Sequence, residues 1–255
     1  MRRAALILAP VVFVGVLLAV WEAACRLLNV PTYFLPAPSA IGLALAQSAP
    51  LLFVSAGRTL GTALTAFLVV GVIANLSALG AASSQIVERG FRPLAVTLQV
   101  TPVVALAPLF QVWAGIEHPQ NAVVALAAIV AFFPIYSGTL TGLSSADPEL
   151  ERLFDLYGAN PWQRLARLRA PSAIPHVLQG HKVGLGLALV GAVVGEISAG
   201  SGGAQGLAWR IVEASNRLEM AKSFAALVAL SVLAGGLHLL YQAMERQALA
   251  WWRGR

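Results

Sequence analysis

The sequence predicts an all-α membrane protein with six transmembrane helices, and three observations lead to this fold class. The 255-residue chain is 58% hydrophobic and only 11% charged, whereas soluble domains carry about 25% charged residues. Its mean hydropathy is +0.76. Charge-free runs long enough to cross a bilayer recur along the chain. In water such a chain would expose far too much apolar surface, so its solvent is predicted to be lipid.

Six stretches are predicted to span the membrane, because a spanning helix needs roughly 20 mostly apolar residues. Five of them are free of charge: 4–21, 59–87, 93–116, 118–146 and 223–244. The sixth, at about 177–200, is interrupted by His181, Lys182 and Glu196. Lys182 lies near one end of this span, from which its ammonium group can reach the interface.

The N-terminal transmembrane helix is expected to be retained within residues 1–28. Met1–Arg3 resembles the basic start of a signal peptide, but no small-residue cleavage site follows the long apolar run. Residues 29–57 also lack charge, yet "VPTYFLPAPSA" contains three prolines, which argue against a helix there. We therefore predict an extracytoplasmic loop followed by a short surface helix at about 39–56.

The distribution of Lys and Arg predicts that both termini are cytoplasmic, because cytoplasmic loops are enriched in these residues. With the N-terminus inside, twelve basic residues fall on the cytoplasmic side and five on the other. The net charge of +6 is thereby explained by membrane orientation, and no nucleic-acid partner is expected.

One charged insert, residues 144–182, interrupts the apolar pattern with nine charged side chains. Asp147 and Pro148 form a helix start, and Gly158 can end that helix in a left-handed conformation. Asn160 and Pro161 repeat the start, and a second helix is predicted from Trp162 to about Arg169.

Pro171 and Pro175 are expected to stop this second helix. The insert is either a solvated connector or a docking surface. Its own helix caps and an exposed tryptophan favour docking.

The insert resembles the cytoplasmic "EAA" loop of binding-protein-dependent ATP-binding-cassette importer permeases. Gly158 and Ala159 match the glycine step of that motif, and "WQRLARLRAPSAIP" matches its downstream helix with two prolines. The segments "LPAPSA", "TPVVALAPLFQVWAGI", "AFFPIYSGTLTGLSSADPEL" and "GLGLALVGAVVGEI" are similar to the nitrate, sulfonate and taurine branch. The motif's Glu-Ala-Ala falls on Arg152, Leu153 and Phe154, so the acidic residue is absent there.

The resemblance implies a type I importer permease fold in a bacterial inner membrane. Residues 58–250 would form a five-helix core containing a coupling loop (residues 144–175), and residues 251–255 a cytoplasmic tail. It implies a homodimer or a paralogous permease partner, two ATPase subunits that bind ATP and Mg²⁺, and an extracytoplasmic solute-binding protein. The residues implied to dock the ATPase are Glu151, Arg152, Leu153, Asp155, Leu156, Tyr157, Gly158, Ala159, Asn160, Pro161 and Trp162.

The chain itself carries no motif for catalysis or metal binding. Neither lysine lies in a G-x-x-x-x-G-K-[ST] phosphate loop, and H-E-x-x-H and G-x-S-x-G are missing. The four histidines are scattered. We expect no catalytic residue, no metal site and no bound cofactor, so energy for uphill transport must come from another subunit.

Several polar residues inside the spans are candidates for the translocation pathway. Glu196 lies either at the pathway or outer gate, or in a hydrogen-bonded position at the interface, since a buried intramembrane charge is costly. The other polar candidates can line the pathway or form interhelical hydrogen bonds: Gln99, Thr101, Gln111, Tyr136, Ser137 and Thr139. Pro102 is a further pathway candidate, and it is expected to kink the third span.

The leading hypothesis is the membrane subunit of an ATP-driven importer for a small anion or a small heterocycle. Nitrate, sulfonates, taurine and pyrimidine or flavin precursors are the substrates that the resemblance implies. An autonomous secondary transporter or channel is the alternative. It predicts inverted repeats with paired broken helices, and no convincing repeat relates the halves of this chain. An intramembrane enzyme is a third class, without a catalytic constellation to support it.

Overall fold

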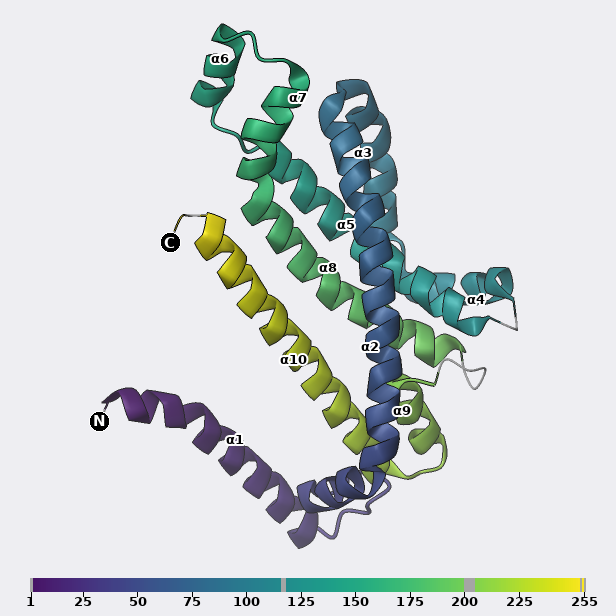
Figure 1. Cartoon of the computed structure of the whole chain (residues 1–255). Coiled ribbons are helices and arrows are strands. Elements are labelled where there is room, and N and C mark those ends of the chain that lie inside the picture. The colour runs from purple at the N-terminus through teal and green to yellow at the C-terminus, as the bar shows by residue number, and fades with distance from the viewer. Residues whose placement is uncertain (1, 116–117, 200–204, 253, 255) are drawn as a thin grey trace.

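The computed structural model describes residues 2–115, 118–199, 205–252 and 254, and within these residues all regular elements are helical (Figure 1). The α-helices are α1 (Arg2–Leu27), α2 (Pro38–Ser83), α3 (Gln85–Val100), α4 (Val103–Ala114), α5 (Pro119–Leu143), α6 (Pro148–Leu156), α7 (Pro161–Arg164), α8 (Ala170–Ala199), α9 (Leu207–Asn216) and α10 (Met220–Trp252). A π-helical turn, η1 (Leu165–Arg169), joins α7 to α8.

The predicted all-α membrane fold is confirmed, with one correction to the third span. Five helices are long and apolar enough to cross a membrane, and α3 with α4 makes a sixth if the pair counts as one. The run 93–116 is predicted as one span kinked at Pro102, whereas the structure has two helices, because the chain bends by 99° between α3 and α4. Thr101 is extended (φ −70°, ψ 127°), since a residue before proline avoids the helical region.

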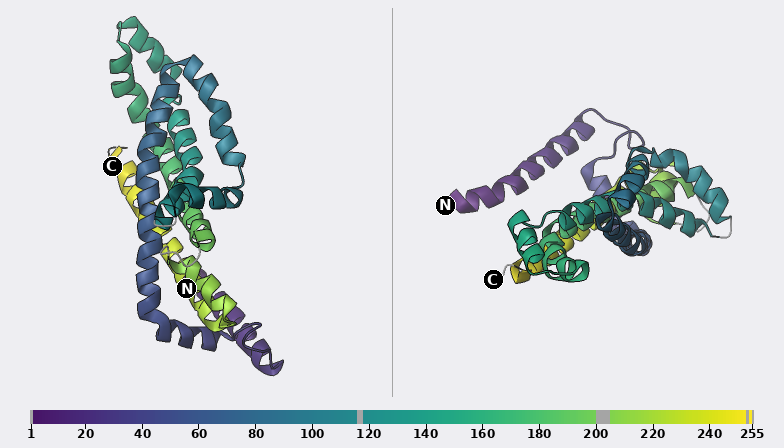
Figure 2. Two further views of the ribbon diagram at one scale, coloured as in Figure 1. Left: turned by 90° about the vertical axis from the view of Figure 1, so that its right-hand side faces the viewer. Right: turned by 90° about the horizontal axis from the view of Figure 1, so that it is seen from above.

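The helix predicted at 39–56 continues into the second span as part of the 46-residue α2, so the boundary expected at residues 57 and 58 lies inside one helix. Pro50 lies within α2, and proline weakens a helix by removing a backbone donor. Figure 2 shows that the first part of α2 lies at an angle to its long remainder.

The core is formed where α5 and α8 pack against each other and against α2. Glycines allow the backbones of α5 and α8 to approach each other closely. A Cβ on Gly138 would lie 2.7 Å from the Gly180 Cα, and one on Gly191 would lie 2.5 Å from the Ala127 Cα. Small residues at such crossings let helices associate closely in lipid, where no hydrophobic effect drives them together.

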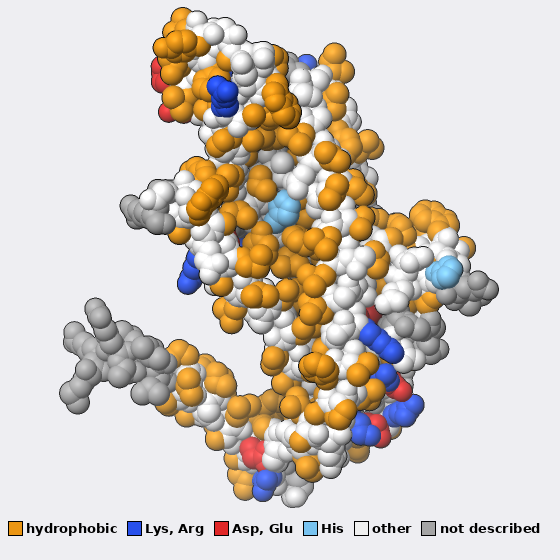
Figure 3. Space-filling view, in the orientation of Figure 1, with side chains coloured by type: hydrophobic (Ala, Val, Ile, Leu, Met, Phe, Trp, Pro, Cys, Tyr) orange, Lys and Arg blue, Asp and Glu red, His pale blue; other side chains and the backbone are white. Residues whose placement is uncertain are grey.

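The outer surface of the bundle is apolar, as a lipid environment requires. Figure 3 shows hydrophobic side chains over most of the visible face, with most of the charged ones near its two ends. Helix α1 stands away from the other spans (Figure 1), and its side chains over residues 9–27 are largely exposed. It is tied to α2 by Glu22, whose carboxylate accepts a 2.9 Å hydrogen bond from the backbone N–H of Ser39.

We predict that Gly191→Ala destabilises the bundle by about 1–3 kcal/mol, because the added methyl group meets the α5 backbone and forces the helices apart. The measurement is the thermal unfolding midpoint in detergent. Gly186→Ala is the matched control in the same helix, since nothing lies within 4 Å of its added Cβ. Equal losses in both variants would contradict the role of this contact.

Candidate functional site

The coupling loop projects beyond the bundle at one end, where α5 leads into it and α8 leads out (Figure 1). Helix α6 ends in a left-handed glycine, Gly158 (φ +62°). The Ala159 N–H donates to the Phe154 carbonyl at 3.0 Å, and the Gly158 N–H donates to the Asp155 carbonyl at 3.0 Å. This pair of bonds is the Schellman motif, which closes the end of α6 and turns the chain sharply toward α7.

Side chains cap both helices of the corner. The Asp147 carboxylate accepts a 2.8 Å bond from the Glu149 N–H at the start of α6. Asn160 and Gln163 form a reciprocal capping box at the start of α7, with bonds of 2.8 and 3.0 Å. Each cap satisfies backbone donors that a helix leaves free at its first turn. The geometry of the corner is therefore encoded locally.

Ion pairs inside the loop hold α6 against the following helix. The Glu151 carboxylate lies 2.6 Å from the Arg169 Nε and 3.2 Å from an Arg164 terminal nitrogen, and Arg164 also pairs with Asp155. The Glu151 and Arg164 side chains are only 20% and 23% exposed, so their attraction is screened less than that of a surface pair. Glu151 and Asp155 are both predicted to dock the ATPase, but their carboxylates pair with arginines of the same loop.

Arg152 lies on the outside of the corner, where the motif would place its acidic residue. Its side chain is 73% exposed and pairs with Glu149 at 2.8 Å. Exposed ion pairs contribute about 0–1 kcal/mol. The guanidinium is consequently available to other partners.

Pro171 and Pro175 do not end the second helix of the loop, contrary to the sequence prediction. Helix runs from Pro161 through to Ala199, a stretch of 39 residues. The π-helical turn η1 precedes these prolines, and in it the Ala170 N–H donates to the Leu165 carbonyl, five residues back. Such a turn inserts one residue into the hydrogen-bond ladder, which helps the chain to accommodate the proline rings.

The tip of the loop presents a cluster of large apolar side chains to its surroundings. Leu156, Tyr157 and Trp162 are 85%, 83% and 73% exposed, and Leu153 is 43% exposed. Beside them, Leu153, Tyr157 and Arg167 help to line a hollow of about 290 Å³. Exposed apolar clusters of this kind mark protein–protein contact sites.

The pathway candidates do not converge on one site. Tyr136 is only 3% exposed and packs between Phe91 and Phe132 in the core. Gln99 lies exposed on α3, and Gln111 half-buried on α4. Thr101 and Pro102 form the bend between those helices, where the Thr101 hydroxyl donates to the Thr97 carbonyl at 2.6 Å.

Ser137 lies in a shallow groove between α5 and α8, which we call the α5–α8 groove. Its polar side chains are Ser137, Thr141, His176 and Gln179, and apolar atoms make up most of its lining. The cavity here measures about 200 Å³. These neutral side chains lie on a part of the bundle that is otherwise apolar.

A second polar network lies inside the bundle, and of its members only Thr139 was a candidate from the sequence. The Thr139 hydroxyl donates to the Asn75 carbonyl oxygen at 2.6 Å, and the Asn75 amide lies 3.1 Å from the His181 Nε2. The His181 Nδ1 lies 2.8 Å from the Val177 carbonyl. The signal in the sequence was Asn75, an amide side chain within the apolar second span, because such a group needs hydrogen-bond partners there.

Glu196, on α8, caps the N-terminus of α9. Its side chain is 2% exposed, and its carboxylate accepts a 3.0 Å hydrogen bond from the Ala208 N–H in the first turn of that helix. The Leu207 N–H donates to the Thr59 hydroxyl at 2.9 Å. A carboxylate is favourable at a helix N-terminus because the free N–H groups carry positive partial charge. Gly206 leaves room for it, since any Cβ there would overlap the carboxylate.

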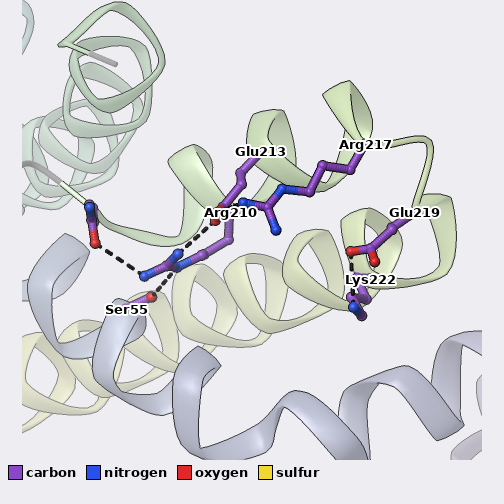
Figure 4. Close-up of polar contacts among 7 residues, drawn as sticks. Ser55, Arg210, Glu213, Arg217, Glu219 and Lys222 are labelled. Atoms are coloured by element: carbon purple, nitrogen blue, oxygen red, sulfur yellow. Dashed lines mark hydrogen bonds and ion pairs between the residues drawn. The ribbon is translucent and has the colours of Figure 1, made fainter. Parts of the chain in front are cut away.

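The charges around α9 form a separate cluster at the end of the bundle opposite the coupling loop (Figures 1 and 4). Arg210 donates to Ser55 at 3.2 Å and pairs with Glu213 at 2.6 Å. Glu213 also pairs with Arg217 at 3.0 Å, and Lys222 pairs with Glu219 at 2.9 Å. Sequence reasoning counted these residues only for orientation.

Within the described part of the chain, no group of three His, Cys, Asp or Glu side chains lies close enough to hold a metal ion. The arrangement offers a capped corner with exposed apolar side chains, a shallow groove between α5 and α8, and a helix capped by a buried carboxylate.

Comparison with known proteins gives one consistent result. The family described as "Binding-protein-dependent transport system inner membrane component" matches residues 67–249. The formylaminopyrimidine transport permease protein of Halalkalibacterium halodurans is 36% identical over 77% of this chain and 78% of its own. The riboflavin transport system permease protein of Chloroflexus aurantiacus is 33% identical, covering 92% and 87%. A putative aliphatic sulfonates transport permease protein of Bacillus subtilis is 26% identical, covering 93% and 85%.

We predict that Glu196→Ala destabilises α9 by about 1–3 kcal/mol, because a buried backbone donor loses its acceptor. Glu196→Gln keeps one carbonyl oxygen and is expected to lose less. The measurement is amide hydrogen exchange across Leu207–Asn216 together with thermal unfolding. Glu219→Ala is the control, since its ion pair is exposed. Unchanged exchange in Glu196→Ala would contradict the capping role.

Proposed function

The chain belongs to the binding-protein-dependent transport system inner membrane components, and from this premise we propose that it is the permease subunit of an ATP-driven importer. The observation that carries the proposal is the coupling loop. Its corner is fixed by its own caps and ion pairs, yet large apolar side chains at its tip remain uncovered. A rigid corner with an apolar tip suits a site on which a separate motor subunit can pull.

In this assembly two ATPase subunits bind ATP and Mg²⁺ and dock at two coupling loops. Those loops come from two copies of this chain or from one copy and a paralogue. An extracytoplasmic solute-binding protein delivers substrate at the end of the bundle that carries α9. Movement of the docked corners swings the spans as rigid bodies and switches access between the two sides.

We place the coupling loop and both termini on the cytoplasmic side of the inner membrane. The Lys and Arg distribution supports this orientation. The Trp252 indole, near the C-terminus, donates to the Pro171 carbonyl at the base of the coupling loop at 2.9 Å. This contact supports placing the C-terminus on the same side of the membrane as the loop.

For the substrate we propose a small uncharged heterocycle, of the pyrimidine or flavin-precursor type, in preference to a small anion. Two of the relatives are described as transporting a formylaminopyrimidine and riboflavin. The α5–α8 groove is mainly apolar and offers hydroxyl, imidazole and amide groups but no Lys or Arg side chain. Lys182, one residue beyond His181 on α8, is neutralised by Glu245 at 2.9 Å. An anion in such a groove would lack a cationic partner.

We predict that a cysteine at the loop tip cross-links to the ATPase subunit that copurifies with this chain. Leu156→Cys, in a Cys25→Ala background, carries a photoactivatable maleimide in the assembled complex. Leu218→Cys is the control, because Leu218 is also well exposed (65%) but lies beside α9 at the other end. Adducts from Leu218→Cys alone, or uptake by the chain reconstituted without an ATPase, would refute the proposal and favour a secondary transporter.

We predict that proteoliposomes containing the complete transporter take up formylaminopyrimidine or riboflavin about tenfold faster than an aliphatic sulfonate, a difference of about 1.4 kcal/mol. Initial rates with isotope-labelled substrates provide the measurement. Gln179→Leu removes a hydrogen-bonding group from the groove and is expected to slow uptake, whereas Val183→Leu keeps every polar group. Faster sulfonate uptake would rule out the substrate class.

A further inference from the structure

Pro175 leaves a gap in the hydrogen-bond ladder at the start of α8. In an α-helix the carbonyl of each residue accepts from the N–H four residues later. For Pro171 that donor would be residue 175, which is a proline and has no N–H. The usual intrahelical partner of the Pro171 carbonyl is therefore missing.

The side chain of Trp252, near the end of α10, donates to this carbonyl. The indole Nε1 lies 2.9 Å from the Pro171 oxygen. An indole N–H is a donor only, so it can fill this gap and has no competing acceptor role. Phe in the same place would keep the ring but not the bond.

Two further contacts lie on the same sides of α10 and α8. The Tyr241 hydroxyl donates to the Leu178 carbonyl at 3.1 Å, and Glu245 pairs with Lys182 at 2.9 Å. Both side chains of the ion pair are largely buried, 12% and 17% exposed. Tyr241, Glu245 and Trp252 are spaced by four and seven residues, which places them on one helix face.

The bond from Trp252 reaches the chain two residues after Arg169, whose guanidinium pairs with Glu151 of α6. The gap left by Pro175 thus lies at the base of the coupling loop, where the loop becomes a span. We propose that Trp252 is a positioning residue for the coupling loop, and that the last helix of the chain holds the base of the loop through the carbonyl freed by Pro175. This inference rests on the proposed function for its consequence in transport, but not for its geometry.

The test is a double-mutant cycle of Trp252→Phe and Pro175→Ala. Alanine at 175 restores a backbone N–H that can donate to the Pro171 carbonyl. If Trp252 acts by filling this gap, Trp252→Phe loosens the coupling loop in the parent chain and has a much smaller effect in the Pro175→Ala chain. Trp251→Phe is the matched control, since Trp251 is the neighbouring indole and is 80% exposed.

The first readout uses the chain alone. A spin label at Leu156→Cys, in the Cys25→Ala background, reports the mobility of the loop tip. We expect Trp252→Phe to raise the mobile population roughly fivefold, the size of one net hydrogen bond expressed as an equilibrium, and Pro175→Ala to remove most of that rise. Equal effects of Trp252→Phe in both backgrounds, or an equal effect of Trp251→Phe, would overturn the proposal.

The second readout is the number of substrate molecules taken up per ATP hydrolysed in the complete transporter. Trp252→Phe is expected to lower this ratio, and Pro175→Ala to restore it in the double variant. An unchanged ratio despite a mobile loop would refute the consequence for transport. If no ATPase subunit binds at all, the proposed function fails, while the spin-label cycle still decides the positioning role.

Discussion

The backbone contact between α5 and α8 fixes the position of every other part of the molecule that we consider functional. Gly138 meets Gly180, and Ala127 meets Gly191, so the two helices approach as closely as their main chains allow. The same two helices enter and leave the coupling loop, and the α5–α8 groove lies along their shared edge. A displacement of the loop is therefore transmitted along a pair of helices that cannot easily slide, because interfaces packed this tightly have little space to deform.

Lipid imposes a second constraint, which is that every backbone group inside it needs a partner. Toward the ends of the spans, side chains from distant parts of the sequence provide such partners at three places. Glu22 caps the start of α2, Glu196 caps the start of α9, and Trp252 fills the gap opened by Pro175. In each case a helix end or a proline is joined to another helix by the bond that satisfies it. The polar contacts of the bundle consequently also determine how its helices are arranged.

The sequence predicted the helical class and the corner at Gly158, because hydropathy and cap residues act locally. Pro102 indicated a kink in the third span, but not a bend of 99° that divides the span into two helices. Pro175 was expected to stop a helix, but an indole from α10 fills the hydrogen-bond gap that it leaves. For Glu196, the partner is set by how α9 folds back, which no spacing reveals. The errors arise where a tertiary contact overrides a local preference.

The charges of the coupling loop bear on how a partner could recognise it. The motif's acidic position holds Arg152, while Glu151, one residue earlier, faces inward to Arg169 and Arg164. A carboxylate that is already paired with two arginines of the loop contributes little to a contact with another subunit. Recognition by the proposed ATPase then falls to the exposed apolar tip around Leu156 and to Arg152. Since the surface pair of Arg152 with Glu149 is weak, the guanidinium can exchange that partner for a carboxylate on the docking subunit at small cost. A partner matched to this chain would therefore carry an acidic side chain facing Arg152.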